Sequence, residues 1–272
     1  MERRRVALRR GVDILVATPG RLLDHAGQKT VDLSGVETAE GTSFRWRGRY
    51  THDLNSAETL ETHLGVFSHF APKIPDQFRT SPFVFLANID PRLQLQVLNQ
   101  VQRPRLVACD TMNFWIESRR PELLELLAKV DLITLNDAEA RQLTEKSNLV
   151  QAARWIMERG PKLVIIKKGE HGAFMFNERE VFFAPAYPLE EVFDPTGAGD
   201  SFAGGFMGYI AKTGDISPAN LRRAVVYGCV MGSFAVERFS VERLLTIGPA
   251  DIQARLQQFR DLVSVEEELA SA

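Results

Sequence analysis

The chain has 272 residues, of which 44% are hydrophobic and 25% charged. These are the proportions of an ordinary globular protein, long enough for one α/β domain or two small ones. The formal net charge of −2 gives no electrostatic reason to expect nucleic acid or an acidic membrane as a partner. No apolar run approaches the roughly 18 residues of a membrane helix, and no convincing signal peptide follows the early arginines. Cys109 and Cys229 lie in apolar contexts, so we expect a cytoplasmic protein with buried thiols.

The first part of the chain reads as a buried strand, a turn and the start of a helix, from Gly11 to His25. It contains Thr18-Pro19-Gly20-Arg21, and residues 8–36 are similar to the segment of DEAD-box RNA helicases that carries the TPGR motif. The chain has neither a GxxxxGK[ST] phosphate loop nor an Asp-Glu-Ala-Asp sequence, so the residues for helicase ATPase chemistry are absent. We expect residues 1–32 to be an atypical, helicase-like N-terminal segment without that activity.

Residues 43–50 alternate aromatic and polar side chains, in the order SFRWRGRY. Such alternation predicts a half-exposed strand. A solvated antiparallel edge explains the pattern without any functional role.

From residue 83 the pattern becomes regular. Short apolar runs alternate with segments of helical periodicity, which predicts a parallel, doubly wound sheet whose ligands bind beyond the carboxyl ends of the strands. The four runs are Phe83–Ala87, Arg105–Cys109, Asp131–Leu135 and Leu163–Ile166.

Polar residues follow these runs, and each group has two interpretations. Asp110 and Asn113 either reach a substrate pocket or belong to a loop whose aromatic residues complete the core. Asn136 and Glu139 have the spacing of a helix capping box. Residues 167–172, Lys-Lys-Gly-Glu-His-Gly, fit a β-hairpin turn in which His171 is exposed.

Residues 194–206 read as an anion-binding turn that leads into a helix. Gly197 and Gly199 let consecutive backbone N–H groups converge on one oxyanion, and the apolar spacing from Phe202 onward predicts a helix whose N-terminus lies at the turn, where a phosphate is most stable. Asp200 in the first helical turn is an unusual second negative charge unless it accepts a proton. An N-cap with a glycine-rich turn is the alternative without function.

Two further helices are expected after this turn. Residues 219–236 form a near-continuous apolar segment in which Gly228, Gly232 and Ser233 would allow close packing. Residues 252–262 have the pattern of a closing amphipathic helix, and an acidic tail covers residues 266–272.

Asp194 to Asp200, with the sequence DPTGAGD, resembles the DTxGAGD signature of the PfkB, or ribokinase-like, carbohydrate kinases, with Pro195 where Thr is common. The resemblance implies that Asp200 is the catalytic base and that the amides of Gly197, Ala198 and Gly199 stabilise charge on the transferred phosphoryl group.

The same resemblance implies roles for residues elsewhere in the chain. Asn136 and Glu139 match an NxxE motif that helps to position Mg²⁺ and phosphate through water. The expected ATP-binding residues are Asn136, Glu139, Lys167, Gly169, Gly172, Asp194, Thr196, Gly197 and Gly199. The substrate candidates are Asp110, Asn113, Arg45 and Arg47. A monovalent cation such as K⁺ is also compatible with the resemblance.

The implied fold is a ribokinase-like, doubly wound, mostly parallel sheet flanked by helices, with a small β lid that includes strands at about 42–52. The kinase-like region covers about residues 33–265, so the family's first βαβ unit is expected to be missing or replaced. The expected function is ATP-dependent phosphorylation of a sugar or sugar-like hydroxyl. The alternatives are a nucleoside kinase or a remnant that binds nucleotide without catalysis. Lid strands in this family also suggest a homodimer.

Overall fold

The computed structural model describes residues 39–50, 54 and 57–264. The helicase-like segment, the expected loss or replacement of a first βαβ unit, and the tail at 266–272 therefore lie outside the described residues. The chain divides into two compact units, one ending at Phe183 and the other beginning at Ala184. Each unit is described by itself.

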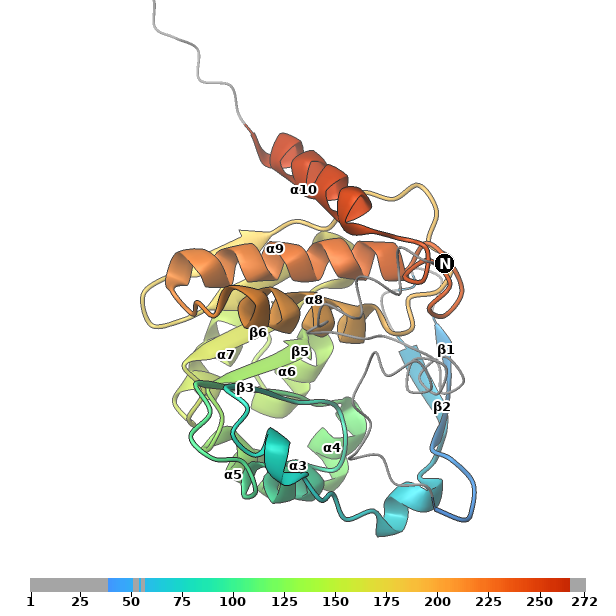
Figure 1. Ribbon diagram of the computed structural model, residues 1–272, viewed down its shortest axis with the longest axis vertical. Coiled ribbons are helices and arrows are strands. Elements are labelled where there is room, and N and C mark those ends of the chain that lie inside the picture. The colour runs from blue at the N-terminus through green and yellow to red at the C-terminus, as the bar shows by residue number, and fades with distance from the viewer. Residues whose placement is uncertain (1–38, 51–53, 55–56, 265–272) are drawn as a thin grey trace, which may run out of the picture. The chain divides into compact units, whose positions relative to one another are not determined.

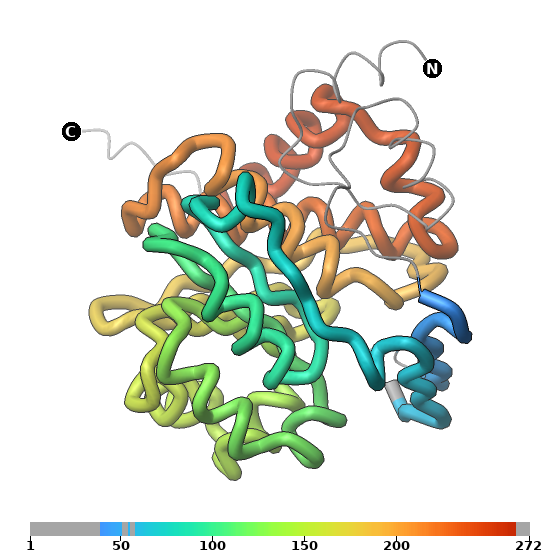
Figure 2. The backbone as a smooth tube through the Cα atoms, turned by 60° about the horizontal axis from the view of Figure 1, so that its bottom comes forward, coloured from blue at the N-terminus to red at the C-terminus, as the bar shows by residue number. Residues whose placement is uncertain are grey.

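The first unit begins with a two-stranded antiparallel sheet of β1 (Arg45–Tyr50) and β2 (Ala57–His63). The exposure of β1 alternates along the strand, as the sequence pattern predicts. The Trp46 indole lies over Gly48, where a β-carbon would be only 2.1 Å from the ring, and its Nε1 donates to Thr59 Oγ1 at 3.1 Å. Two 3₁₀ turns follow, Gly65–His69 and Asp76–Phe78, and Figure 2 traces this path from blue to cyan.

The larger sheet has six strands in the order β3-β4-β5-β6-β7-β8. Pairing is parallel from β3 to β6 and antiparallel between β6 and β7 (Figure 1). The strands are β3 (Phe83–Leu86), β4 (Leu106–Asp110), β5 (Leu132–Asn136), β6 (Leu163–Lys167), β7 (Ala173–Phe176) and β8 (Val181–Ala184). The four predicted apolar runs are thus confirmed as β3 to β6, and β4 is buried at every position.

Helices join the parallel strands, which confirms the predicted alternation. They are α3 (Pro91–Leu98), α4 (Asn113–Ser118), α5 (Arg120–Leu127), α6 (Asp137–Thr144) and α7 (Leu149–Met157). Asn148 caps α7, where its side chain accepts hydrogen bonds from the N–H groups of Val150 and Gln151.

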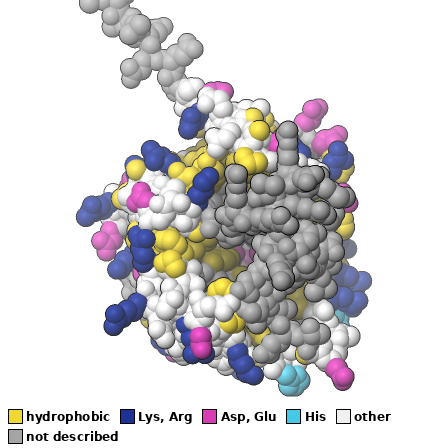
Figure 3. All heavy atoms as spheres, in the orientation of Figure 1, with side chains coloured by type: hydrophobic (Ala, Val, Ile, Leu, Met, Phe, Trp, Pro, Cys, Tyr) yellow, Lys and Arg dark blue, Asp and Glu magenta, His cyan; other side chains and the backbone are white. Residues whose placement is uncertain are grey.

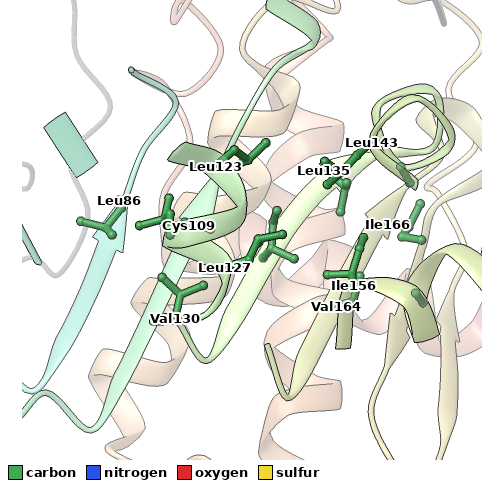
Figure 4. Close-up of a cluster of buried hydrophobic side chains, with 14 of the residues drawn as sticks. Leu86, Cys109, Leu123, Leu127, Val130, Leu135, Leu143, Ile156, Val164 and Ile166 are labelled. Atoms are coloured by element: carbon green, nitrogen blue, oxygen red, sulfur yellow. The ribbon is translucent and has the colours of Figure 1, made fainter. Parts of the chain in front are cut away.

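One hydrophobic cluster joins these helices to the sheet. Figure 4 shows Leu123 and Leu127 of α5 among side chains from the strands, with Leu143 of α6 and Ile156 of α7 in the same cluster. Cys109 belongs to this cluster and is fully buried. Burial raises the pKa of both Cys109 and Cys229, so the expectation of buried thiols is confirmed.

The second unit contains α8 (Ala198–Thr213), α9 (Pro218–Ala235) and α10 (Pro249–Val263). The expected apolar face of α8 is buried at Phe202, Phe206 and Ile210. The helices α8 and α9 pack closely because a β-carbon at Gly205 would lie 2.7 Å from Tyr227 O, and one at Gly228 would lie 2.8 Å from the Phe202 ring. Close packing through Gly228 is therefore confirmed.

Charged side chains of both signs are interspersed on the face shown in Figure 3, in keeping with the small net charge. Among the helices that the structure describes, none combines the length and the apolar character that crossing a membrane requires.

We predict that Gly205→Ala lowers the free energy of unfolding by about 1–3 kcal/mol, because the new methyl group meets Tyr227 O and Met231 Cγ at 2.7 Å. Denaturant unfolding would measure the change. Gly232→Ala is the matched control, since its nearest neighbour would be Ala198 O at 3.4 Å, and Ala favours a helix over Gly by up to about 1 kcal/mol. Equal stability changes for the two variants would contradict this account of the packing.

Candidate active site

Three charged side chains gather at the carboxyl ends of β4, β5 and β6. Asp110 is the last residue of β4 and Lys167 the last of β6. Lys167 Nζ lies 3.3 Å from Asp110 Oδ2, and these side chains are only 18% and 7% exposed. Glu139 follows β5 and interacts electrostatically with both. The parallel pairing thus brings together three residues that the sequence analysis selected separately.

Asn136 and Glu139 form the capping box that their spacing allows. Asn136 Oδ1 accepts from Glu139 N at 2.8 Å, while Glu139 Oε2 accepts from Asn136 N at 2.7 Å. Burial raises the pKa of Glu139 to about 7, and the negative charges of Asp110 and Asp137 act in the same direction, while Lys167 and the bond to Asn136 N lower it. A structural cap does not exclude a role in phosphate or metal binding, because a cation near Glu139 would relieve the cost of its buried charge.

Gln94 is a residue of this region that sequence reasoning missed. It lies on α3 and is 1% exposed. Its Nε2 is within 2.9 Å of Leu86 O and of Ala87 O, and within 3.0 Å of Asp110 O. One amide therefore ties the ends of β3 and β4 together, although its own Oε1 is buried without a partner in the described chain. The only sequence signal was a glutamine on the apolar side of a predicted helix.

Asn113 begins α4, and its Oδ1 accepts from Phe114 N at 3.0 Å. The next residues contribute to packing: Trp115 and Ile116 are 6% and 3% exposed, and Trp115 meets Phe114 edge to face. The structure therefore supports the core interpretation for these aromatic residues, and a substrate role for Asn113 stays a prediction.

The segment after β6 is the predicted hairpin turn. Lys168 N donates to Gly172 O at 2.7 Å, and His171 is exposed, as expected. Gly172 has φ +99°, a conformation that side-chain-bearing residues rarely adopt. The hairpin interpretation is confirmed, and a role of Gly169 and Gly172 in nucleotide binding remains compatible with it.

In the second unit, the 194–200 turn leads directly into α8. Gly197 is the N-cap with φ +81°, and among the described residues no atom beyond its chain neighbours and the backbone of α8 lies within 4 Å of where its β-carbon would stand. Asp194 Oδ1 accepts from Thr196 N at 3.0 Å, and Ala198 N donates to Pro195 O at 3.2 Å. These bonds bend the chain directly before the first turn of α8, whose amides have no carbonyl acceptor within the helix.

Asp200 lies in the first turn of α8 and is exposed. A helix N-terminus favours an anion through its N–H groups and its dipole. A carboxylate at the same place keeps its negative charge and can accept a proton. The structure thus has the predicted turn leading into a helix with Asp200 in its first turn, and the roles of anion binding and proton acceptance stay predictions.

Arg45 and Arg47 lie on the exposed face of β1, and their side chains are 67% and 61% exposed. Both form ion pairs with Glu61 of β2. These ion pairs form a local charge network on the β1–β2 sheet. A role of Arg45 and Arg47 in substrate binding stays a prediction.

The chemistry of these residues fits a Mg²⁺ ion held mainly by substrate. Across residues 39–50, 54 and 57–264, no three or more His, Cys, Asp or Glu side chains form a group suited to a metal. Mg²⁺ commonly takes only one or two protein carboxylates, with waters and substrate phosphates completing its shell. Glu139 could supply such a carboxylate, because a nearby cation favours the charged form that burial disfavours.

Comparisons with known proteins identify the family and the fold of the chain. Residues 22–246 match the pfkB family of carbohydrate kinases. The chain therefore belongs to the pfkB family of carbohydrate kinases. The cytidine kinase of Thermococcus kodakarensis is 32% identical over 182 residues, which cover 65% of this chain and 64% of that protein. The nucleoside kinase of Methanocaldococcus jannaschii is 27% identical over 64% of this chain and 54% of its own length.

Solved structures show the same fold. Aminoimidazole riboside kinase from Salmonella enterica, complexed with aminoimidazole riboside and an ATP analogue, superposes with a TM-score of 0.65 at 22% identity, covering 88% of this chain and 82% of that one. A probable sugar kinase from Rhizobium etli gives a TM-score of 0.71 at 21% identity, covering 89% and 76%. The ribokinase-like α/β fold is thus confirmed. The sequence matches to the Thermococcus cytidine kinase and the Methanocaldococcus nucleoside kinase span less than two thirds of the length of those proteins.

We predict that Glu139→Gln removes a pH-dependent loss of stability. The folded protein keeps a proton on Glu139 up to about pH 7, whereas the ordinary pKa of this carboxyl is 4.5. The unfolding free energy of the wild type should therefore fall as the pH rises from 4.5 to above 7, while glutamine can still complete the capping box. The expected gain of the variant at pH 8 is about 1–2 kcal/mol, less than the full shift implies because Glu139 keeps some solvent contact.

Urea unfolding at several pH values would measure this difference. Glu125→Gln, which replaces an exposed glutamate on α5, controls for the loss of one charge. A difference between wild type and Glu139→Gln that stays constant over this range would contradict the prediction.

Proposed function

We propose that this chain is an ATP-dependent kinase that phosphorylates a hydroxyl group of a sugar or nucleoside. The observation that carries the proposal is the start of α8. Gly197, with left-handed backbone, is the N-cap of α8, no described residue beyond its chain neighbours and the backbone of α8 lies within 4 Å of where its β-carbon would stand, and the carboxylate of Asp200 lies in the first turn. These are the parts that phosphoryl transfer needs: donors for the transferred group and a base for the acceptor.

In this proposal, Asp200 accepts the proton of the acceptor hydroxyl as its oxygen attacks the γ-phosphorus of ATP. The bond from that phosphorus to the bridging oxygen breaks, and ADP leaves. The amides of Gly197, Ala198 and Gly199 donate hydrogen bonds to the transferred phosphoryl oxygens, where charge develops. Asp194, through its bond from Thr196 N, fixes the turn that aims these amides.

The charged residues of the first unit supply nucleotide binding. Lys167, with the turn glycines Gly169 and Gly172, binds phosphate and allows close approach of the nucleotide, and Asn136 belongs to the same site. Mg²⁺, when bound through Glu139 and water, neutralises phosphate charge. A monovalent ion such as K⁺ remains an expectation from the family.

The acceptor is best sought first among nucleosides. The relatives named above include a cytidine kinase and a nucleoside kinase, and a ribokinase of Staphylococcus aureus is 28% identical over 43% of this chain. Such acceptors carry a ribosyl hydroxyl, so a single chemistry serves both classes. Asp110, Asn113, Arg45 and Arg47 were the sequence candidates for acceptor contacts.

We predict that Asp200→Asn lowers kcat by about 10²–10⁴, the usual contribution of a general base, with little change in the Kd for ATP. Coupled ADP-release assays and calorimetry would measure the two quantities. Asp251→Asn is the matched control, because Asp251 occupies the same first-turn position of α10 and accepts a hydrogen bond from Gly248 N, at the N-cap of its own helix. An Asp200→Asn enzyme that retains its turnover would exclude this role.

The alternative is a protein that binds nucleotide without transferring phosphate. Ribose, fructose, deoxygluconate, cytidine and inosine form a suitable panel of acceptors for [γ-³²P]ATP. Transfer above background to any acceptor would reject this alternative, whereas tight ATP binding with no transfer would support it.

We further propose that the β1–β2 sheet contributes to a homodimer. Phe44, next to β1, stacks on Phe67 with ring centroids 5.5 Å apart, although these residues are 37% and 39% exposed. A second copy would cover this aromatic surface. Phe44→Ser should shift the protein toward monomer in sedimentation velocity, while Val181→Ser, at another exposed apolar residue, should not. A wild-type monomer at all concentrations would contradict the proposal.

A further inference from the structure

Asp110 and Lys167 form an ion pair that spans one strand of the sheet. They end β4 and β6, and β5 lies between these strands. Lys167 Nζ reaches across to Asp110 Oδ2 at 3.3 Å. The pair is largely buried, with side-chain exposures of 18% and 7%, so solvent screens it much less than a surface pair.

The carboxylate of Asp110 is already engaged by its own protein. Its Oδ1 accepts from Thr111 N at 2.8 Å, and its Oδ2 faces Lys167. Its backbone oxygen accepts from Gln94 Nε2 at 3.0 Å. These bonds fix the direction of the carboxylate, and at 5% exposure the residue offers little surface to a sugar hydroxyl.

Lys167 has a long side chain whose ammonium group would sample many positions if nothing held it. Asp110 limits that freedom and directs the ammonium group toward the carboxyl ends of the strands. Lys167 also precedes the turn that contains Gly169 and Gly172. Asp110, which is itself anchored through α3 by Gln94, therefore helps to fix the position of the ammonium group.

We propose that Asp110 is a positioning residue that holds Lys167 for binding an ATP phosphate, and that it does not contact the acceptor. This inference rests on the proposed function, because it assigns Lys167 to the nucleotide. It replaces the sequence expectation of a substrate contact at Asp110.

A double-mutant cycle tests the inference, with Asp110→Asn, Lys167→Met and the double variant. Michaelis constants for ATP and for the acceptor would be measured separately, with the Kd for MgATP from calorimetry. Lys167→Met should raise the Kd for MgATP about tenfold or more, and Asp110→Asn should raise it about three- to tenfold, the range expected for coupled neighbours. The acceptor KM should stay within about twofold in both, and the double variant should match Lys167→Met alone because Asp110 acts through Lys167.

Asp131→Asn is the matched control. Asp131 Oδ2 accepts from Val107 N at 2.9 Å, so this partly buried contact ties the residue before β5 to β4, at the end of the strands opposite Asp110. The control should lose stability without a change in MgATP affinity. Asp110→Glu, which keeps the charge, should recover part of the affinity lost in Asp110→Asn. If Asp110→Asn does not fold, the cycle of Asp110→Glu with Lys167→Met gives the same comparison.

A raised acceptor KM with unchanged MgATP affinity in Asp110→Asn would overturn the inference, as would additive losses in the double variant. In either case a wild type that still transfers phosphate leaves the proposed function in place. A wild type that binds no MgATP would overturn both.

Discussion

Parallel pairing of β4, β5 and β6 is the constraint on which the first unit depends. Because Asp110 pairs with Thr134, and Asn136 with Lys167, the strand ends meet at one edge of the sheet. The apolar residues before those ends are buried, as expected of parallel strands covered on both faces, and the polar residues follow at the strand ends. Burial of apolar side chains thus determines where three charged groups lie. The chemistry of the edge is a consequence of the packing of the core.

The second unit depends on the close packing of two helices. The helices α8 and α9 approach closely enough that Gly205 and Gly228 leave no room for a β-carbon. Close packing immobilises α8, and with it the amides at its start. Around α10, Arg255 lies 3.7 Å from the centre of the Phe234 ring and bonds Glu237, which also binds Arg243. This network secures the C-terminal part of the unit through its own charges.

The sequence was sufficient for the elements and for most of the candidate residues, because hydrophobic periodicity and the DPTGAGD turn are local signals. The four parallel strands and the three helices of the second unit lie where the patterns predicted them. Two kinds of information were missing. Contacts such as Gln94 with Asp110 and Lys167 with Asp110 join residues 16 and 57 positions apart, and no local pattern encodes them. The pair Asn136 and Glu139 has both a structural and a chemical explanation. The capping box confirms the structural one, and the role in positioning Mg²⁺ and phosphate stays a prediction.

Two glycines of α8 and its cap resist substitution for opposite reasons. At Gly205 the backbone is ordinary and the obstacle is volume, so shortening Met231 would remove part of it. At Gly197 no described neighbour would meet a β-carbon, and the obstacle is handedness, since φ is +81°. No trimming of a neighbour can relieve a chiral restriction, and only a residue that tolerates left-handed backbone, such as asparagine, would be accommodated. Substitution is therefore restricted by backbone stereochemistry at the N-cap of α8 and by steric crowding between α8 and α9.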